Sequence, residues 1–109
     1  MNLKVSIIIC VLNGEKSIYK TVESILNQNY LNLELIIIDG GSSDNTIEII
    51  KSFDSSKIKW ISEPDKGISD AFNKGIKLAT GDYINFQGDG DGFLNSSSIS
   101  DLFSNLDLK

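Results

Sequence analysis

Apolar positions along the chain change their spacing several times, and these changes predict strands that alternate with helices. Continuous apolar runs, typical of strands buried on both faces, cover residues 5–12 and 33–38, and shorter runs cover residues 57–61 and 82–86. Apolar residues at the spacing of one helix face follow each run. In chain order, the predicted helices carry Ile18, Val22, Ile25 and Leu26; Ile47, Ile50 and Phe53; Ile68, Ala71, Phe72, Ile76 and Ala79; and Ile99, Leu102, Phe103 and Leu106.

Polar residues and glycines mark the ends of these helices. Ser43 or Asp44 is predicted to be the N-cap of the second helix, because their side-chain oxygens accept hydrogen bonds from free amides. Gly81 is predicted to end the third helix as its C′ residue, and the fourth helix is predicted over residues 97–106. No repeat or boundary divides the chain. We therefore expect one α/β domain over residues 1–109, a Rossmann-like parallel sheet with flanking helices.

Composition restricts the class of protein. The chain has 109 residues, 40% apolar and 23% charged, as in one small globular domain. Its net charge of −5 and its lack of His argue against a nucleic-acid partner, because duplex binding needs clustered Lys and Arg. No apolar run reaches the roughly 20 residues that cross a bilayer, so we expect a soluble, cytoplasmic chain. The single cysteine, Cys10, is predicted to be a buried structural thiol.

Candidate chemistry begins where the second predicted strand ends. Asp39 follows that strand and precedes two glycines and a polar turn into a helix. In open α/β sheets ligands bind at this edge, and the Asp39 carboxylate can accept hydrogen bonds from a nucleobase or a ribose. A plain turn with a helix cap remains the alternative. The glycine pair does not match the fingerprint of dinucleotide-binding loops.

A second acidic cluster follows the fourth predicted strand. Asp89 and Asp91 lie two residues apart on a glycine-rich loop and can hold a divalent cation that leaves positions open for diphosphate oxygens. The pattern lacks the glycine and the closing glutamate of an EF-hand loop. A solvated Asp/Gly turn remains the alternative.

A polar segment, residues 62–75, lies between the two clusters. Pro64 ends the third strand, and Asp65 and Lys66 begin a loop that opens a helix whose amino end can face an anion. Asp70, Asn73 and Lys74 lie at helical spacing on its polar face, and Lys66 and Lys74 are candidate partners of phosphate charge. A solvated helix face is the alternative.

Four segments together resemble the N-terminal, donor-binding part of family 2 glycosyltransferases. They are residues 5–15, 38–46, 62–75 and 81–91, in the order that this family shows, so the resemblance extends over nearly the whole chain. The resemblance implies the N-terminal half of a GT-A fold and inverting transfer of a sugar from a nucleotide-diphospho-sugar, most directly a UDP-sugar. It also implies a divalent metal, Mn²⁺ or Mg²⁺, held by a D-x-D-type motif.

The resemblance assigns roles to particular residues. Those matched to nucleotide binding are Leu12, Asn13, Glu15, Asp39, Ser42, Asp65, Lys66, Asn73 and Asp89. Asp91 and Asp89 are matched to the metal, although Gly90 stands where the family often has an acid. No residue of this chain is matched to the general base, which is expected beyond Lys109. The isolated chain is therefore expected to bind donor without transferring sugar.

The expected partners follow from the same resemblance. They are a nucleotide-sugar donor, a saccharide or lipid-linked acceptor for polysaccharide or glycolipid synthesis, and a second copy of the chain in a homodimer. A full-length protein would then lie at the inner face of a membrane. A non-catalytic nucleotide-binding or interaction module is the alternative. A signalling receiver is disfavoured, because the first strand ends in Leu12-Asn13-Gly14 without an acidic pair.

Overall fold

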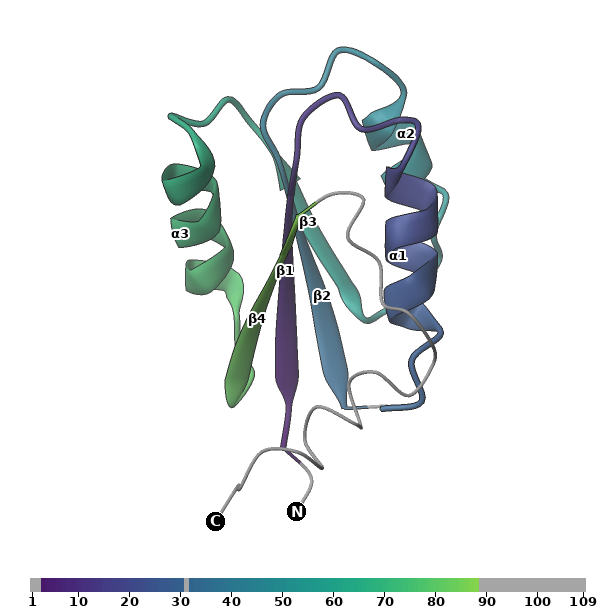
Figure 1. Cartoon of the computed structure of the whole chain (residues 1–109), viewed down its shortest axis with the longest axis vertical. Coiled ribbons are helices and arrows are strands. Elements are labelled where there is room, and N and C mark those ends of the chain that lie inside the picture. Colours follow the sequence, from purple (N-terminus) through teal and green to yellow (C-terminus); the bar gives the residue numbers. More distant parts are fainter. Residues whose placement is uncertain (1–2, 31, 89–109) are drawn as a thin grey trace.

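The computed structural model describes residues 3–30 and 32–88, which form a parallel α/β sheet (Figure 1). Four strands pair in parallel in the order β3-β2-β1-β4. The strands are β1 Val5–Val11, β2 Leu33–Asp39, β3 Ile58–Ser62 and β4 Tyr83–Gly88. The helices are α1 Ile18–Leu26, α2 Thr46–Lys51 and α3 Ile68–Leu78. The predicted strands and first three helices are therefore confirmed in order and type.

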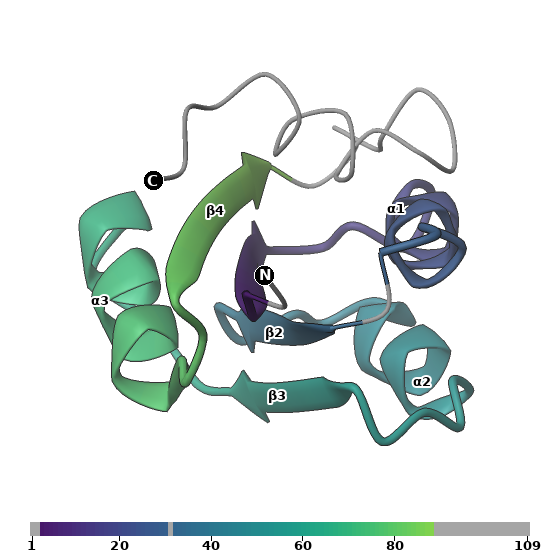
Figure 2. The same cartoon turned by 90° about the horizontal axis from the view of Figure 1, so that it is seen from below.

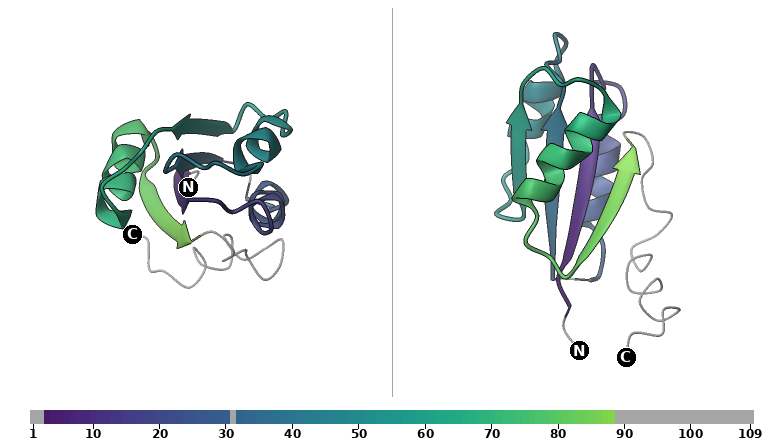
Figure 3. Two further views of the ribbon diagram at one scale, coloured as in Figure 1. Left: turned by 90° about the horizontal axis from the view of Figure 1, so that it is seen from above. Right: turned by 90° about the vertical axis from the view of Figure 1, so that its left-hand side faces the viewer.

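The helices cover both faces of the sheet. Helices α1 and α2 lie on one face and α3 lies on the other (Figures 2 and 3). Side chains of the central strands alternate between the two layers: Ile7 and Ile9 pack with α1 and α2, whereas Ile8 packs with Ala71 of α3. All three isoleucines are fully buried. This double burial explains why most residues of β1 and β2 are apolar on both faces.

A glycine lets α3 approach the sheet closely. A Cβ atom on Gly75 would lie 2.5 Å from Cγ2 of Ile8, which is buried in the centre of β1. Ala71, one turn earlier, is also buried against the sheet. The small residues Ala71 and Gly75 therefore set the separation between helix and sheet. Within the described ranges, no helix has the length and apolar composition that crossing a membrane requires.

The predicted C′ role of Gly81 is wrong. Helix α3 already ends at Leu78, and its C-cap, Ala79, is extended with φ −71° and ψ 137°. Gly81 instead lies against β1, where an added Cβ would come within 2.7 Å of the Ser6 nitrogen and 2.9 Å of the Lys4 carbonyl oxygen. The glycine is required by close backbone approach and not by helix termination.

The second helix also differs from the prediction. It begins at Thr46 with Asn45 as the N-cap, and it ends at Lys51, before Phe53. The Asp44 carboxylate nevertheless accepts a hydrogen bond from the Thr46 amide, over 2.9 Å. The predicted N-cap is thus displaced, because Asp44 acts from one residue before the cap position. The predicted helix over residues 97–106 lies outside the described residues.

A buried carboxylate joins the strands near the amino end of the sheet. Glu34 of β2 is 4% exposed, and its Oε2 accepts hydrogen bonds from the Ser6 hydroxyl over 2.6 Å and the Thr80 amide over 2.6 Å. The Ser6 hydroxyl oxygen in turn accepts a hydrogen bond from the Gly81 amide over 2.8 Å. These contacts fix the connection between α3 and β4 against β1.

Candidate functional site

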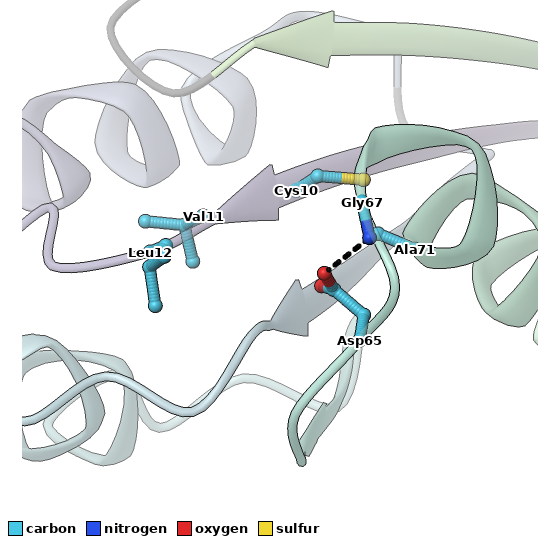
Figure 4. A pocket seen from close by; sticks show the side chains of 6 residues that line it. All are labelled: Cys10, Val11, Leu12, Asp65, Gly67 and Ala71. Carbon is cyan, nitrogen blue, oxygen red and sulfur yellow. Dashed lines mark hydrogen bonds between the residues drawn. The ribbon is translucent and has the colours of Figure 1, made fainter.

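A pocket of about 240 Å³ lies at the carboxyl end of β1 (Figure 4). Its lining residues come from the end of β1, the loop between β3 and α3, and the first turn of α3: Cys10, Val11, Leu12, Asp65, Gly67 and Ala71. The location agrees with the general placement of ligand sites in open α/β sheets. Leu12 and Asp65 are therefore the predicted site residues that line the pocket.

Cys10 differs from its prediction as a buried thiol. It is half-buried and lies on the pocket wall near the carboxyl end of β1. Burial, together with the negative charge of Asp65, raises the pKa of the Cys10 thiol to about 11. Cys10 is therefore a protonated, weakly nucleophilic wall residue at neutral pH.

Asp65 supplies the carboxylate of the pocket. Its Oδ1 accepts a hydrogen bond from the Gly67 amide over 3.1 Å, which Figure 4 marks with a dashed line. Gly67 has φ 118°, a conformation that favours glycine. On its other side, Asp65 packs on Gly40, where an added Cβ would lie 2.8 Å from Oδ2. Two glycines thus fix where this carboxylate lies.

Asp39 is fully buried at the end of β2, where it organises the turn into α2. Its Oδ2 accepts hydrogen bonds from the Gly41 amide over 3.0 Å, the Ser42 amide over 2.8 Å and the Ser62 hydroxyl over 2.8 Å. Its Oδ1 accepts the Ser42 hydroxyl. The structure therefore gives Asp39 and Ser42 a role within the protein, and their contact with a nucleotide stays a prediction.

Asn13 joins the loop after β1 to the loop after β2. Its side-chain Oδ1 accepts hydrogen bonds from the Ser43 backbone amide over 2.8 Å and the Asp44 backbone amide over 3.3 Å. The backbone amide of Asn13 donates to the Ser42 hydroxyl oxygen over 2.8 Å. Asn13 has φ 52°, which its short amide side chain tolerates. Asn13 is exposed at the rim but does not line the pocket.

Glu15 strengthens the same connection between loops. Its amide donates to Asp44 Oδ2 over 3.2 Å, and its Oε2 accepts the Asn45 amide over 3.4 Å. The Gly14 amide donates to the Thr46 hydroxyl oxygen over 2.8 Å. The predicted residues Asn13, Glu15 and Ser42 thus lie together, and the structure uses them to hold two loops at the carboxyl edge.

Lys66 and Asn73 are exposed and do not line the pocket. The Lys66 amide donates to Asp70 Oδ2 over 2.9 Å, which ties the loop to the first turn of α3. Asp89 and Asp91 lie outside the described residues. Within residues 3–30 and 32–88, no three Asp, Glu, Cys or His side chains are grouped so as to hold a metal ion.

Sequence reasoning did not assign Cys10, Val11, Gly67 or Ala71 to the site. A signal for two of them existed, because Gly67 and Ala71 lie four residues apart at the start of a helix and therefore on one of its faces. No sequence pattern indicated that this face would meet the end of β1. That contact depends on the crossover that places α3 over the sheet.

The comparison with known sequences decides the family. Residues 6–108 match the sequence profile described as Glycosyl transferase family 2. The chain belongs to glycosyl transferase family 2. This family 2 chain is 43% identical over 97 residues to the UDP-Glc:alpha-D-GlcNAc-diphosphoundecaprenol beta-1,3-glucosyltransferase WfaP of Escherichia coli. The match covers 88% of this chain and 38% of that relative, so the family 2 chain spans less than two fifths of its length.

Solved structures share the fold. The family 2 chain matches S. aureus TarS 1-349 in complex with UDP-GlcNAc with a TM-score of 0.80 at 23% identity, over 94% of this chain and 30% of that one. It matches the mannosyltransferase PcManGT from Pyrobaculum calidifontis, in complex with GDP-Man and Mn2+, with a TM-score of 0.80 at 20% identity, over 86% of this chain and 29% of that one. The sheet and helices of the family 2 chain therefore have the GT-A glycosyltransferase fold.

Proposed function

We propose that this chain forms the donor site of an inverting glycosyltransferase that takes its sugar from a nucleotide-diphospho-sugar. The pocket at the end of β1 carries the proposal, because its walls are largely apolar and one carboxylate, Asp65, lies among them. A slot with apolar walls and few polar groups suits a flat nucleobase. A UDP-sugar is the proposed donor: the name of WfaP includes UDP-Glc, and TarS has been solved with UDP-GlcNAc.

A divalent cation, Mn²⁺ or Mg²⁺, belongs to the proposal. The described residues alone do not fit such an ion, and the proposal therefore rests on Asp89 and Asp91. Support comes from the register of the sheet, since Gly88 at the end of β4 pairs with Cys10 of the pocket. Asp89 follows Gly88 directly in the sequence, and Asp91 comes two residues after Asp89. A bound cation would offset the charge of a diphosphate beside a chain of net charge −5.

The proposed reaction is a single displacement at the anomeric carbon of the donor sugar. The acceptor hydroxyl oxygen forms the new bond, the bond to the diphosphate oxygen breaks, and a general base takes the hydroxyl proton. The residues of this chain bind and orient the nucleotide, and none is assigned as that base. We expect a saccharide or lipid-linked acceptor, as in polysaccharide or glycolipid synthesis at the inner face of a membrane, and a homodimer stays a prediction.

A non-catalytic nucleotide-binding or interaction module is the second candidate. It is favoured by the side chains of Asn13, Asp39 and Ser42, which are engaged in hydrogen bonds between and within loops. Gly90, where the family often has an acid, also favours it. An assay of sugar transfer separates the candidates. The 109-residue chain is expected to transfer no sugar under either candidate. A form extended at its carboxyl end is expected to transfer sugar only if the protein is an enzyme.

The direct test of the donor site is calorimetric titration with UDP in the presence and absence of Mn²⁺. We expect binding that Mn²⁺ strengthens, and we expect UDP to slow alkylation of Cys10, because the thiol lies on the pocket wall. Leu12→Glu places a charge at an exposed wall position and should abolish both effects. Ile76→Glu, on exposed α3 surface away from the pocket lining, is the matched control. Equal UDP affinity in both variants would show that the pocket is not part of the nucleotide site.

A further inference from the structure

Lys74 of α3 reaches back to the loop that connects β3 to α3. Its Nζ lies 3.1 Å from Glu63 Oε1, 3.5 Å from Asp70 Oδ2 and 3.1 Å from the Pro64 carbonyl oxygen. The side chain is 19% exposed, so it is largely packed and does not extend freely into solvent. One cation therefore connects the end of β3, the loop and the helix.

A second connection closes the same loop further along. Asp70, which contacts Lys74, also accepts a hydrogen bond from the Lys66 amide over 2.9 Å. The loop is thus attached to α3 on both sides of Asp65: at Glu63 and Pro64 before it, and at Lys66 after it. Asp65 itself lines the pocket. Its position depends on how firmly the flanking residues are held.

Burial does little to hold this loop. Glu63, Pro64, Lys66 and Gly67 are all exposed, so the hydrophobic effect that fixes the strands does not fix them. Gly67 has φ 118° and no neighbour within 4 Å of an added Cβ, which leaves the loop room to move. Polar contacts must therefore offset the conformational entropy that is lost when the loop becomes ordered. The contacts of Lys74 reach two of its residues, Glu63 and Pro64.

The charges in this group support one another. The Lys66 amide hydrogen bond and the positive charge of Lys74 lower the pKa of Asp70. Burial acts to lower the pKa of Lys74, but the carboxylates of Glu63 and Asp70 outweigh it and the pKa of Lys74 is raised. Lys74 therefore stays a cation, and Asp70 an anion, across the neutral range.

We propose that Lys74 is a positioning residue that holds the β3–α3 loop on α3 and thereby keeps Asp65 in the pocket. This role differs from the phosphate contact that the sequence suggested for Lys74, and it rests on the contacts of Nζ with Glu63, Asp70 and the Pro64 carbonyl oxygen. Its consequence for nucleotide affinity rests on the proposed function. Its consequence for the pocket wall does not, since Asp65 lines the wall beside Cys10 whatever ligand binds there.

The test uses the 109-residue chain and its only cysteine as a reporter. Lys74→Met removes the cation and keeps the apolar stem, Lys74→Arg restores the charge, and Lys77→Met is the matched control on exposed α3 surface. Alkylation of Cys10 by iodoacetamide is followed across pH without nucleotide. We expect Lys74→Met to react about two- to fivefold faster, because loss of a partly exposed ion pair shifts local equilibria by about that factor.

The pH profile distinguishes repositioning of Asp65 from a general loosening. In Lys74→Met the pKa of Cys10 should fall below about 11 but stay above its ordinary value of 9.0, because the charge of Asp65 moves away from the thiol whereas burial, the larger cause of the raised pKa, remains. Lys74→Arg and Lys77→Met should keep the wild-type profile. An unchanged rate and profile in Lys74→Met would overturn the proposal. If that variant does not fold, Glu63→Gln decides in the same way, since it removes one of the two negative charges that pair with Lys74, at an exposed residue.

Titration with UDP separates this inference from the proposed function. If the pocket binds UDP, Lys74→Met should raise the Kd about two- to fivefold, whereas Lys74→Arg and Lys77→Met should leave it unchanged. If UDP binds to none of the proteins, the proposed function fails and the alkylation profiles still decide the role of Lys74. UDP affinity that is equal in Lys74→Met and wild type would show that the nucleotide does not depend on this loop, and would overturn the role of Lys74 in binding.

Discussion

Glu34 of β2 and Lys59 of β3 form an ion pair, with 2.8 Å between Oε1 and Nζ, at the amino end of the sheet. The Glu34 side chain is buried, whereas the Lys59 side chain is largely exposed. Burial acts to raise the pKa of Glu34, but hydrogen bonds from Lys59, Ser6 and Thr80 outweigh it and lower the pKa to about 2. The edge of the sheet opposite the pocket is therefore held by one ionised carboxylate.

Glu34→Gln should lower the free energy of unfolding at neutral pH by roughly 3 kcal/mol, as expected when one member of a buried charged network is neutralised. The pKa of Glu34 is lower in the folded protein than in the unfolded chain. Its contribution is therefore complete above the ordinary value of 4.5 and is lost as pH falls towards 2. Denaturant unfolding at several pH values should show the wild type and variant converging in that window. Glu48→Gln, on exposed α2 surface, should show no such convergence.

Asp39→Ala should destabilise the fold, because it leaves two backbone amides and two hydroxyls without their acceptor. One hydrogen bond to a charged group contributes about 1.5–3 kcal/mol. Because several are lost together, we expect the free energy of unfolding to fall by at least about 2 kcal/mol. Thermal and denaturant unfolding measure this. Ser43→Ala, on the exposed part of the same turn, is the control.

Asp39→Asn then tests the predicted nucleotide contact separately. It keeps an acceptor oxygen for the turn and removes the charge, so it should remain folded at the temperature of a UDP titration. If Asp39 contacts the nucleobase or ribose, UDP binding should weaken by about 1.5–3 kcal/mol. Wild-type affinity in this variant would leave Asp39 with the turn as its only role.

Gly81→Ala should destabilise the protein by about 1–3 kcal/mol, the usual range for an overpacked site. The new methyl group would lie 2.7 Å from the Ser6 nitrogen and 2.9 Å from the Lys4 carbonyl oxygen, and backbone atoms at the start of β1 cannot rotate away. Denaturant unfolding provides the measurement. A free energy of unfolding equal to that of the wild type would contradict this prediction. It would mean that the α3–β4 connection can move away from β1 without loss of stability.

Asp91→Ala should remove most of the effect of Mn²⁺ on UDP binding while leaving weak, metal-independent binding. The reason is that a carboxylate next to a diphosphate is useful only with a cation between the two. Paired calorimetric titrations with Mn²⁺ and with a chelator measure the difference. Asp54→Ala, an exposed acid before β3, should behave as wild type. Equal UDP affinity with and without metal in the wild type would count against the metal assignment.

The sequence by itself determined the order and type of the described elements. Strands β1 and β2 are buried on both faces, so most of their side chains are apolar, and such runs are visible without a structure. The stripe of Ile18, Val22 and Ile25 was visible for the same reason, because one face of α1 packs on the sheet. Membership of the family was also visible, since it is carried by local segments in a fixed order.

Tertiary structure decided what the polar residues at the carboxyl edge do. The side chains of four residues at this edge suit a ligand or a loop equally well: Asn13, Glu15, Asp39 and Ser42. Only the fold shows that they form hydrogen bonds within and between the loops after β1 and β2. The roles of Gly81 and Lys74 were decided in the same way. Local sequence specifies burial through periodicity, whereas a hydrogen-bond partner far along the chain depends on which strands and loops the fold brings together.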